Sequence, residues 1–176
     1  MTRVCLLGGE NVNLEYELLS HETSRNALAT YDLREPYDNA VALETVSLGS
    51  AVALLNDLNW YLVRFVSEAL VLEPSVSDSE WLSRDVATAV RDDDLAPAET
   101  DRFLKIYGVV EPGANEADEQ SDPGEGGADI ETKQDRPPRL VEPMFVTRTG
   151  PDLPEYDLRD VEETVVVRVT ESEFGA

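Results

Sequence analysis

The order of apolar and polar positions in the first quarter of the chain predicts strands and short helices. Apolar runs bounded by turn residues mark two buried strands, and helical spacing marks two segments between them. In chain order we expect a strand over 3–7, a helix that ends near residue 20, a helix over 23–31 and a strand over 39–46. Gly8 and Gly9 end the first strand, and Asn11 or Asn13 is expected to cap the first helix.

One long helix over residues 48–72 is the strongest element that the pattern predicts. Apolar side chains recur there at alternating spacings of four and three, and a second register lies beside the first. The first register consists of Ala51, Leu55, Leu58, Leu62, Phe65 and Ala69. At about 100° per residue the two registers merge into an apolar arc of about 160°, which indicates a core helix wide enough to serve an oligomer as well.

The segment after this helix carries a complete helix-start signal. Ser77 and Glu80 have the spacing of a capping box, while Val76 and Trp81 occupy the two positions of a hydrophobic staple. We therefore expect a helix over residues 77–90.

Residues 97–110 are compatible with two structures. Pro97 at a first helical position and Gly108 at the end favour a short helix over 97–107. The alternation over 102–110 also suits a strand, so both alternatives stay open.

The composition changes sharply in the segment 112–138. Its 27 residues include eight acids, four glycines and four prolines, and Ile130 is the one large aliphatic side chain. So little apolar surface cannot offset the entropy of ordering, which predicts a disordered acidic insertion. Two strands are expected after it, over 140–148 and 161–170, and Pro143 places the first of them at a sheet edge.

These elements predict an α+β fold in which a small mixed or antiparallel sheet packs against a helical layer with one long central helix. The chain has 176 residues, enough for one domain with a sizeable core. We expect residues 1–111 to form the α+β core, 112–138 the insertion, and 139–176 a strand pair that completes the same domain.

The charge of the chain restricts its environment and partners. It has 37 acidic and 14 basic residues, a net charge of −23, and only two of the basic residues are lysines. Such an excess argues against anionic lipid and non-specific nucleic acid as partners. Acids spread over the whole chain with scarce lysine favour a salt-saturated cytoplasm over a DNA mimic or an acidic chaperone. Because a Debye length of about 3 Å at 1 M salt screens repulsion, nucleic acid is unexpected there but not excluded.

The sequence offers little catalytic, metal-binding or membrane chemistry. Cys5 and His21 are the only cysteine and histidine, so one chain cannot build a zinc site from the usual nitrogen and sulfur ligands. No P-loop, EF-hand or nucleophile elbow is present. A non-enzymatic protein without cofactors is favoured, although carboxylate chemistry with Mg²⁺ stays open. No apolar run approaches the roughly 20 residues of a membrane span, and a cytoplasmic protein is expected.

Gly8, Gly9 and Asn11 form a candidate phosphate loop. Backbone amides between a strand and a helix can cradle an anion. The loop lacks the G-x-G-x-x-G spacing and any lysine, and Glu10 would repel an anion. A plain strand-to-helix turn needs the same glycines, and this simpler interpretation is favoured.

Asp57, Asn59, Trp60 and Arg64 are the candidate partner-binding residues on the predicted long helix. Asn59 falls within the apolar arc, where an amide can set the register of paired helices. Trp60 lies among charged residues on the opposite face, where it either anchors a partner or is covered by another element. We expect the remaining chain to cover it.

Three segments are distinctive enough to resemble a known family. They are Thr2–Leu6, the run Thr-Tyr-Asp-Leu-Arg-Glu-Pro-Tyr at 30–37 and the run Leu-Leu-Asn-Asp-Leu-Asn-Trp-Tyr-Leu at 54–62. Together they resemble a family of small, acidic, uncharacterised haloarchaeal proteins over residues 1–110. The resemblance implies a salt-adapted cytoplasmic protein and transfers no activity and no functional residues.

The leading hypothesis is therefore a non-enzymatic interaction or regulatory protein, expected to be a homodimer or to bind a protein partner. A small-molecule or nucleotide-binding protein that uses the Gly8-Gly9 loop is one alternative. A ribosome-associated factor is the other, because adaptation to high salt would mask the usual basic surface.

Overall fold

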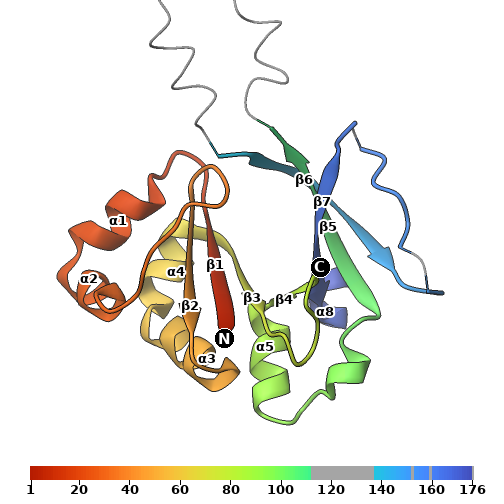
Figure 1. Ribbon diagram of the computed structural model, residues 1–176, viewed down its shortest axis with the longest axis horizontal. Coiled ribbons are helices and arrows are strands. Elements are labelled where there is room, and N and C mark those ends of the chain that lie inside the picture. Colours follow the sequence, from red (N-terminus) through yellow and green to blue (C-terminus); the bar gives the residue numbers. More distant parts are fainter. Residues whose placement is uncertain (112–136, 152, 159, 176) are drawn as a thin grey trace, which may run out of the picture.

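The computed structural model describes residues 1–111, 137–151, 153–158 and 160–175 (Figure 1). Within these residues the strands form one seven-stranded sheet in the order β2-β1-β3-β4-β7-β5-β6. The strands are β1 (Thr2–Gly8), β2 (Ala40–Thr45), β3 (Val66–Leu72), β4 (Trp81–Ser83), β5 (Phe103–Val110), β6 (Arg139–Thr147) and β7 (Glu163–Val169). The helices are α1 (Leu14–Ser20), α2 (Glu22–Leu28), α3 (Leu48–Asp57), α4 (Asn59–Phe65), α5 (Arg84–Arg91), the 3-10 helix η1 (Pro97–Glu99) and α8 (Glu171–Gly175). The predicted α+β class is confirmed, with a larger sheet than expected.

The sheet consists of two antiparallel halves joined by a very short strand. β2-β1-β3 forms one half and β7-β5-β6 the other (Figure 1). Between them lies β4, in which Leu82 pairs antiparallel with Val71 of β3 and parallel with Arg168 of β7. Because β4 has three residues, few backbone hydrogen bonds cross the middle of the described sheet. Side-chain contacts across this junction therefore matter for its stability.

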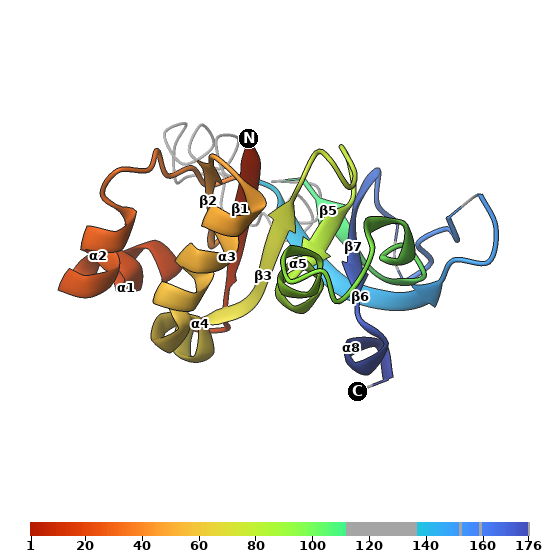
Figure 2. The ribbon, with the colours of Figure 1, turned by 90° about the horizontal axis from the view of Figure 1, so that it is seen from below.

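The two faces of the sheet carry separate apolar cores. Helices α1 to α5 pack on one face of β1–β4 (Figure 2) and form the main core with Val4, Leu6, Val41, Leu43, Val71 and Leu82. The opposite face, called the second face below, carries a second core that includes Cys5, Leu7, Leu70, Val165, Val167 and Val169. Alternate strand residues point to opposite faces, which is why neighbours such as Cys5 and Leu6 belong to different cores.

Most of the predicted short elements are confirmed within a few residues. β1, α1, α2 and β2 occupy the four positions expected in the first quarter of the chain. Asn13, one of the two expected N-caps, accepts a hydrogen bond from the amide of Tyr16 at 3.1 Å. β6 lies at the sheet edge, as Pro143 predicts, and β7 lies within the second C-terminal segment expected as a strand.

The long helix expected over 48–72 is wrong beyond Phe65. α3 ends at Asp57, Leu58 departs from helical geometry with φ −91° and ψ 4°, and α4 ends at Phe65. The rest of the segment is β3, which pairs antiparallel with β1. Ala69 suits both the helical register and the alternation of a strand, so pairing with the central β1 decides the structure.

The helix expected over 77–90 begins only at Arg84. Ser77 does accept a hydrogen bond from the amide of Glu80 at 3.0 Å, but within a turn. The side chain of Glu80 binds two arginines instead of closing the capping box, and β4 follows directly. Ser83 is the actual N-cap of α5. The ion pairs of Glu80 with two arginines distant in sequence therefore prevent the capping box that the local pattern predicts.

The structure decides the two alternatives at residues 97–110 in favour of a strand. η1 is confined to Pro97–Glu99, and β5 then runs between β7 and β6, so the helix expected over 97–107 is wrong. The predicted insertion over 112–138 lies outside the described residues except for its last two.

A buried cluster connects β3 to β5 across the junction. Glu68 accepts a hydrogen bond from the hydroxyl of Tyr107 at 2.6 Å and forms an ion pair with Lys105. The side chains of Glu68 and Lys105 are 10% and 19% exposed, so water screens their attraction little. Burial, and then the charge and hydrogen bond of Glu68, raise the pKa of Tyr107, whose hydroxyl therefore stays a donor at neutral pH.

Glu80, the residue before β4, anchors this strand to the β7-β5-β6 half. Its Oε1 accepts a hydrogen bond from Nε of Arg168 at 2.8 Å, and its Oε2 accepts one from Nη2 of Arg148 at 2.7 Å. Arg168 also donates to Oγ1 of Thr100 at 2.9 Å. Burial by itself raises the pKa of Glu80, but the hydrogen bonds and charges of the two arginines outweigh it and lower the pKa below its ordinary value.

Glu80→Gln is expected to destabilise the fold, because it leaves two guanidinium groups without their carboxylate. We expect a loss of about 3 kcal/mol in the free energy of unfolding at pH 7. The folded-state pKa is lowered, so this contribution is present above the unfolded pKa of about 4.3 and is lost as the pH falls through the folded value. Chemical denaturation of both proteins at pH 7 and below pH 4 measures it.

The difference between wild type and variant should therefore shrink in acid. The exposed Glu99 provides the matched control, since Glu99→Gln should change the free energy of unfolding little at either pH. An equal loss for Glu80→Gln at both pH values would contradict the assigned ion pairs.

Candidate functional site

The structure places the predicted partner-binding residues on one exposed surface of the helical layer. Asp57 ends α3, while Asn59, Trp60 and Arg64 belong to α4, which packs beside α1 (Figure 2). Val63 of the same helix is 72% exposed. We call these five residues the α4 surface.

Trp60 is 50% exposed, so the expectation that the remaining chain covers it is wrong. The guanidinium carbon of Arg64 lies 3.8 Å from the centre of the indole ring, and its Nη1 donates to the carbonyl of Trp60 at 2.9 Å. The indole also makes edge contacts with the rings of Tyr61 and His21, at centre distances of 5.0 and 6.0 Å. These contacts hold a large aromatic ring in place at the protein surface.

Asn59 is exposed and is not the buried register-setting amide that the apolar arc predicts. Its Oδ1 accepts a hydrogen bond from Nη1 of Arg84 at 2.8 Å, and Nη2 of Arg84 donates to Oδ1 of Asn56 at 3.1 Å. The predicted apolar arc assumes a helix that is continuous through Leu58. Because the helix breaks there, the residues that follow turn to a different face.

Two arginines lie at the α4 surface, Arg64 of α4 itself and Arg84, which reaches Asn59 from α5. Within the part of the chain that the structure describes, neither Arg64 nor Arg84 forms an ion pair. Their contacts are with an aromatic ring, backbone carbonyls and side-chain amides. In a chain with 37 acidic and 14 basic residues, two such arginines beside an exposed tryptophan are an unusual arrangement.

The amides of Gly8 and Gly9 in the candidate phosphate loop already have protein partners. Gly8 donates to the carbonyl of Asn39 at 2.8 Å, and Gly9 donates to the carbonyl of Phe65 at 2.9 Å. The side chain of Asn39 in turn donates to the carbonyl of Gly9 at 3.3 Å and accepts from the first amide of α1 at 2.9 Å. Asn11 is exposed in a left-handed conformation with φ 62°. This geometry favours the plain strand-to-helix turn over a phosphate loop.

The other reactive side chains serve packing. Cys5 is buried in the second core, and burial raises the pKa of its thiol to about 12, so it is not a nucleophile at neutral pH. His21 stacks against Phe65 at a ring-centre distance of 5.9 Å and lies 3.6 Å from the carboxylate of Glu17. The described residues contain no group of three His, Cys, Asp or Glu side chains that could hold a metal ion. They also contain no helix long and apolar enough to cross a bilayer.

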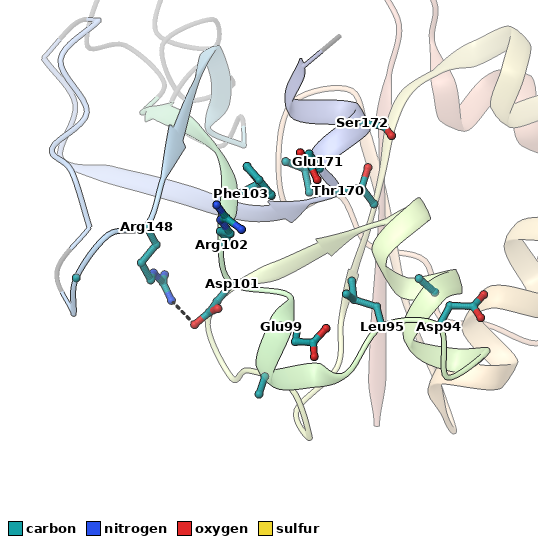
Figure 3. A pocket seen from close by; sticks show the side chains of 14 residues that line it. Asp94, Leu95, Glu99, Asp101, Arg102, Phe103, Arg148, Thr170, Glu171 and Ser172 are labelled. Atoms are coloured by element: carbon teal, nitrogen blue, oxygen red, sulfur yellow. Dashed lines mark ion pairs between the residues drawn. The ribbon is translucent and has the colours of Figure 1, made fainter.

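A cavity of about 970 Å³ opens between the end of α5, the start of β5 and α8 (Figure 3). Arg148 points toward Asp101 across 3.6 Å and is also bound to Glu80, so its charge is used within the fold. Nε of Arg148 is buried and has no hydrogen-bond partner among the described residues. Three further carboxylates line the cavity, from Asp94, Glu99 and Glu171. In a chain with 37 acidic and 14 basic residues, an acidic lining is expected by composition alone. The lining therefore indicates no particular class of ligand.

Two members of the exposed surface were missed at the level of sequence. Arg84 reaches Asn59 from α5, and this approach depends on the packing of α3 against α5 rather than on any sequence spacing. Val63 lies outside the predicted apolar arc, and this position alone would have indicated that its side chain is exposed.

The fold and the α4 surface thus define an α+β protein with an exposed aromatic surface and no metal-binding cluster in its described residues. The chain belongs to a family of unknown function (DUF5804), whose model matches residues 2–109. This confirms the expected membership of an uncharacterised family over nearly the expected residues. The match ends within β5, so β6, β7 and α8 lie beyond it. No curated protein and no solved structure matches the chain.

Gly8→Ala is expected to destabilise the protein by about 1–3 kcal/mol through overpacking. A Cβ atom at Gly8 would lie 2.3 Å from Nδ2 of Asn39 and 2.8 Å from its carbonyl oxygen, and Asn39 is held beside the loop by its own hydrogen bonds to Gly9 and Leu14. Gly9→Ala is the matched control, because the nearest atom to its Cβ would be 3.5 Å away. Urea denaturation of the two variants measures the difference, and equal stability would contradict the packing role assigned to Gly8.

Proposed function

We propose that the protein is a salt-adapted, cytoplasmic, non-enzymatic interaction or regulatory module that acts as a homodimer through the α4 surface. The observation that carries this proposal is the half-exposed ring of Trp60, stacked under Arg64. Tryptophan and arginine are the residue types most enriched among those that dominate binding energy at protein interfaces. A ring already held by its neighbours loses little side-chain entropy when a partner covers it.

The exposure of the α4 surface supports burial against a partner. Val63 and Trp60 place apolar surface in water on adjacent positions of the helix, at 72% and 50% exposure. Covering them would remove this surface from water, and excluding water would strengthen any ion pair made by Arg64.

The charge pattern of α4 favours a second copy of the chain as the partner. Asp57 is exposed at the end of α3, just before the break at Leu58, and Arg64 follows Trp60 by four positions in α4, so opposite charges stand before and after the ring along the chain. A two-fold axis near Trp60 would run the two helices antiparallel and set Arg64 opposite Asp57 of the partner subunit. Such an isologous interface makes each ion pair twice. It would also supply a carboxylate to Arg64, which forms no ion pair among the described residues of its own chain.

Concentrated salt would allow two strongly acidic chains to form this dimer. Each chain carries a net charge of −23, so two chains repel each other in dilute buffer. At molar ionic strength this repulsion is screened within about 3 Å, whereas close, partly buried pairs are screened much less. We therefore infer that both folding and dimerisation are adapted to a salt-rich cytoplasm.

The oligomeric state tests the proposed interface. Sedimentation velocity in molar KCl is expected to show a dimer for the wild type and a monomer for Trp60→Ala, because the substitution removes the central ring. Leu158→Ala is the matched control, since Leu158 is also 50% exposed but lies in the loop after β6. A monomeric wild type would contradict the proposal, and co-sedimentation with ribosomes would then favour the ribosome-associated alternative.

Charge reversal distinguishes a symmetric interface from another contact. Asp57→Arg and Arg64→Asp should each weaken the dimer at least tenfold, because like charges then face each other. The double variant should restore it, because each ion pair is re-formed with opposite polarity. A double variant as weak as either single variant would exclude the proposed two-fold arrangement.

Salt adaptation predicts that thermal stability rises with salt. The melting temperature should increase between about 0.1 and 3 M KCl, where the Debye length falls from about 10 Å to below 3 Å. The melting temperature is measured by circular dichroism on the Trp60→Ala variant. Because this variant is expected to be monomeric, its salt dependence reports the screening of charge repulsion within the fold and not dimerisation. A melting temperature that is constant or falls with KCl in this variant would contradict salt adaptation of the fold.

A further inference from the structure

A second cavity lies on the face of the sheet opposite the α4 surface. Its volume is about 310 Å³, and it is lined by residues of β1, β2 and β4 and by the segment 32–37. That segment is part of the distinctive run at 30–37. The run contributes no residue to the α4 surface, and the fold alone does not explain its composition. All of its lining residues fall within residues 2–109, the range that the family model matches.

A bridge to the edge of the sheet holds the segment 32–37 in place. The amide of Arg34 donates to the carbonyl of Ala42 at 2.9 Å, and the amide of Ala42 donates back to the carbonyl of Arg34 at 2.8 Å. Pro36 and Tyr37 follow, and a turn closes where the amide of Ala40 donates to the carbonyl of Tyr37 at 3.1 Å. The backbone therefore positions Tyr37 against the second core.

Two aromatic side chains and a small residue shape the cavity. Tyr37 and Trp81 are half-buried and pack against the second core, and the alanine at position 42 leaves room beside them. The rings of Tyr37 and Trp81 line the same cavity and leave a volume of about 310 Å³ open. Burial, and then Cys5 and Glu163, raise the pKa of Tyr37, which keeps its hydroxyl protonated at neutral pH.

The rim of the cavity offers donors and acceptors in loose pairs. Arg34 lies 3.3 Å from the carboxylate of Asp32, and Arg3 lies 3.7 Å from that of Glu44. The side chains of the first pair are 77% and 84% exposed, and those of the second 59% and 52%. Exposed pairs of this kind contribute little to stability, so their charges are available to a ligand.

We propose that this cavity binds a planar nitrogen heterocycle of nucleobase or nucleoside size. The ring would stack on Tyr37 or Trp81, because aromatic stacking suits any base. Arg34 would donate to ring or carbonyl acceptors, and Asp32 would accept from an exocyclic amine. A site of about 310 Å³ is at the small end of ligand cavities, which excludes a dinucleotide. The site is on the opposite face from the α4 surface and does not depend on dimerisation.

Isothermal titration calorimetry of the full chain in molar KCl tests this site. The probes are adenosine, guanosine, cytidine and uridine, and ribose serves as the control without a heterocycle. We expect saturable binding of at least one nucleoside at micromolar to millimolar concentration and none of ribose. No saturable heat with any nucleoside, or equal binding of ribose, would overturn the proposal.

Three variants locate the binding. Ala42→Leu should fill the cavity and weaken nucleoside binding at least tenfold while the melting temperature is retained. Asp32→Asn and Arg34→Met should each weaken it by a similar factor without filling the cavity. Arg25→Met, at an exposed arginine of α2, is the matched control and should leave the affinity unchanged. Nucleoside binding that survives all three cavity variants would overturn the proposal.

Discussion

The carboxylate of Glu80 is the contact on which the middle of the sheet depends. β4 is only three residues long, and Glu80 anchors its start to β7 and to the end of β6 through Arg168 and Arg148. Where β4 ends, Glu68 ties β3 to β5 through Lys105. Two partly buried anions thus join the halves of a sheet that has little backbone pairing at its centre. A partly buried carboxylate between two guanidinium groups is costly to disturb, because removing it leaves Arg168 without an ion pair among the described residues and Arg148 with Asp101 alone.

The sheet itself separates the two surfaces to which we assign binding. The helices cover one side of β1–β4, and α4 presents Trp60 and Arg64 there. The other side carries the second core and, at its margin, the cavity beside Tyr37 and Trp81. Both surfaces use arginines that lack strong carboxylate partners, in a chain with few basic residues. Because the two surfaces lie on opposite faces, a dimer formed through α4 would leave the cavity open.

The sequence predicted the elements whose signals are local, and it failed where contacts distant in sequence compete with those signals. β1, α1 and the N-cap Asn13 follow from apolar runs and capping chemistry and are confirmed. The pattern predicts the end of a helix where β3 forms, since Ala69 satisfies both periods, and the pairing of Ser77 with Glu80 predicts a helix start where β4 forms. The candidate surface was only partly predictable. The exposure of Trp60 depends on which elements pack around the start of α4, and Arg84 comes from another helix.

The sequence by itself determined the charge of the chain, several short local elements and the α+β class, because periodicity and charge are properties of the chain alone. Tertiary structure decided which segments pair in the centre of the sheet, since a strand such as β3 exists only against a partner such as β1. It also decided that the amides of Gly8 and Gly9 bond within the protein and that Trp60 faces solvent. Both depend on hydrogen bonds and burial between residues far apart in the chain, which no local pattern encodes.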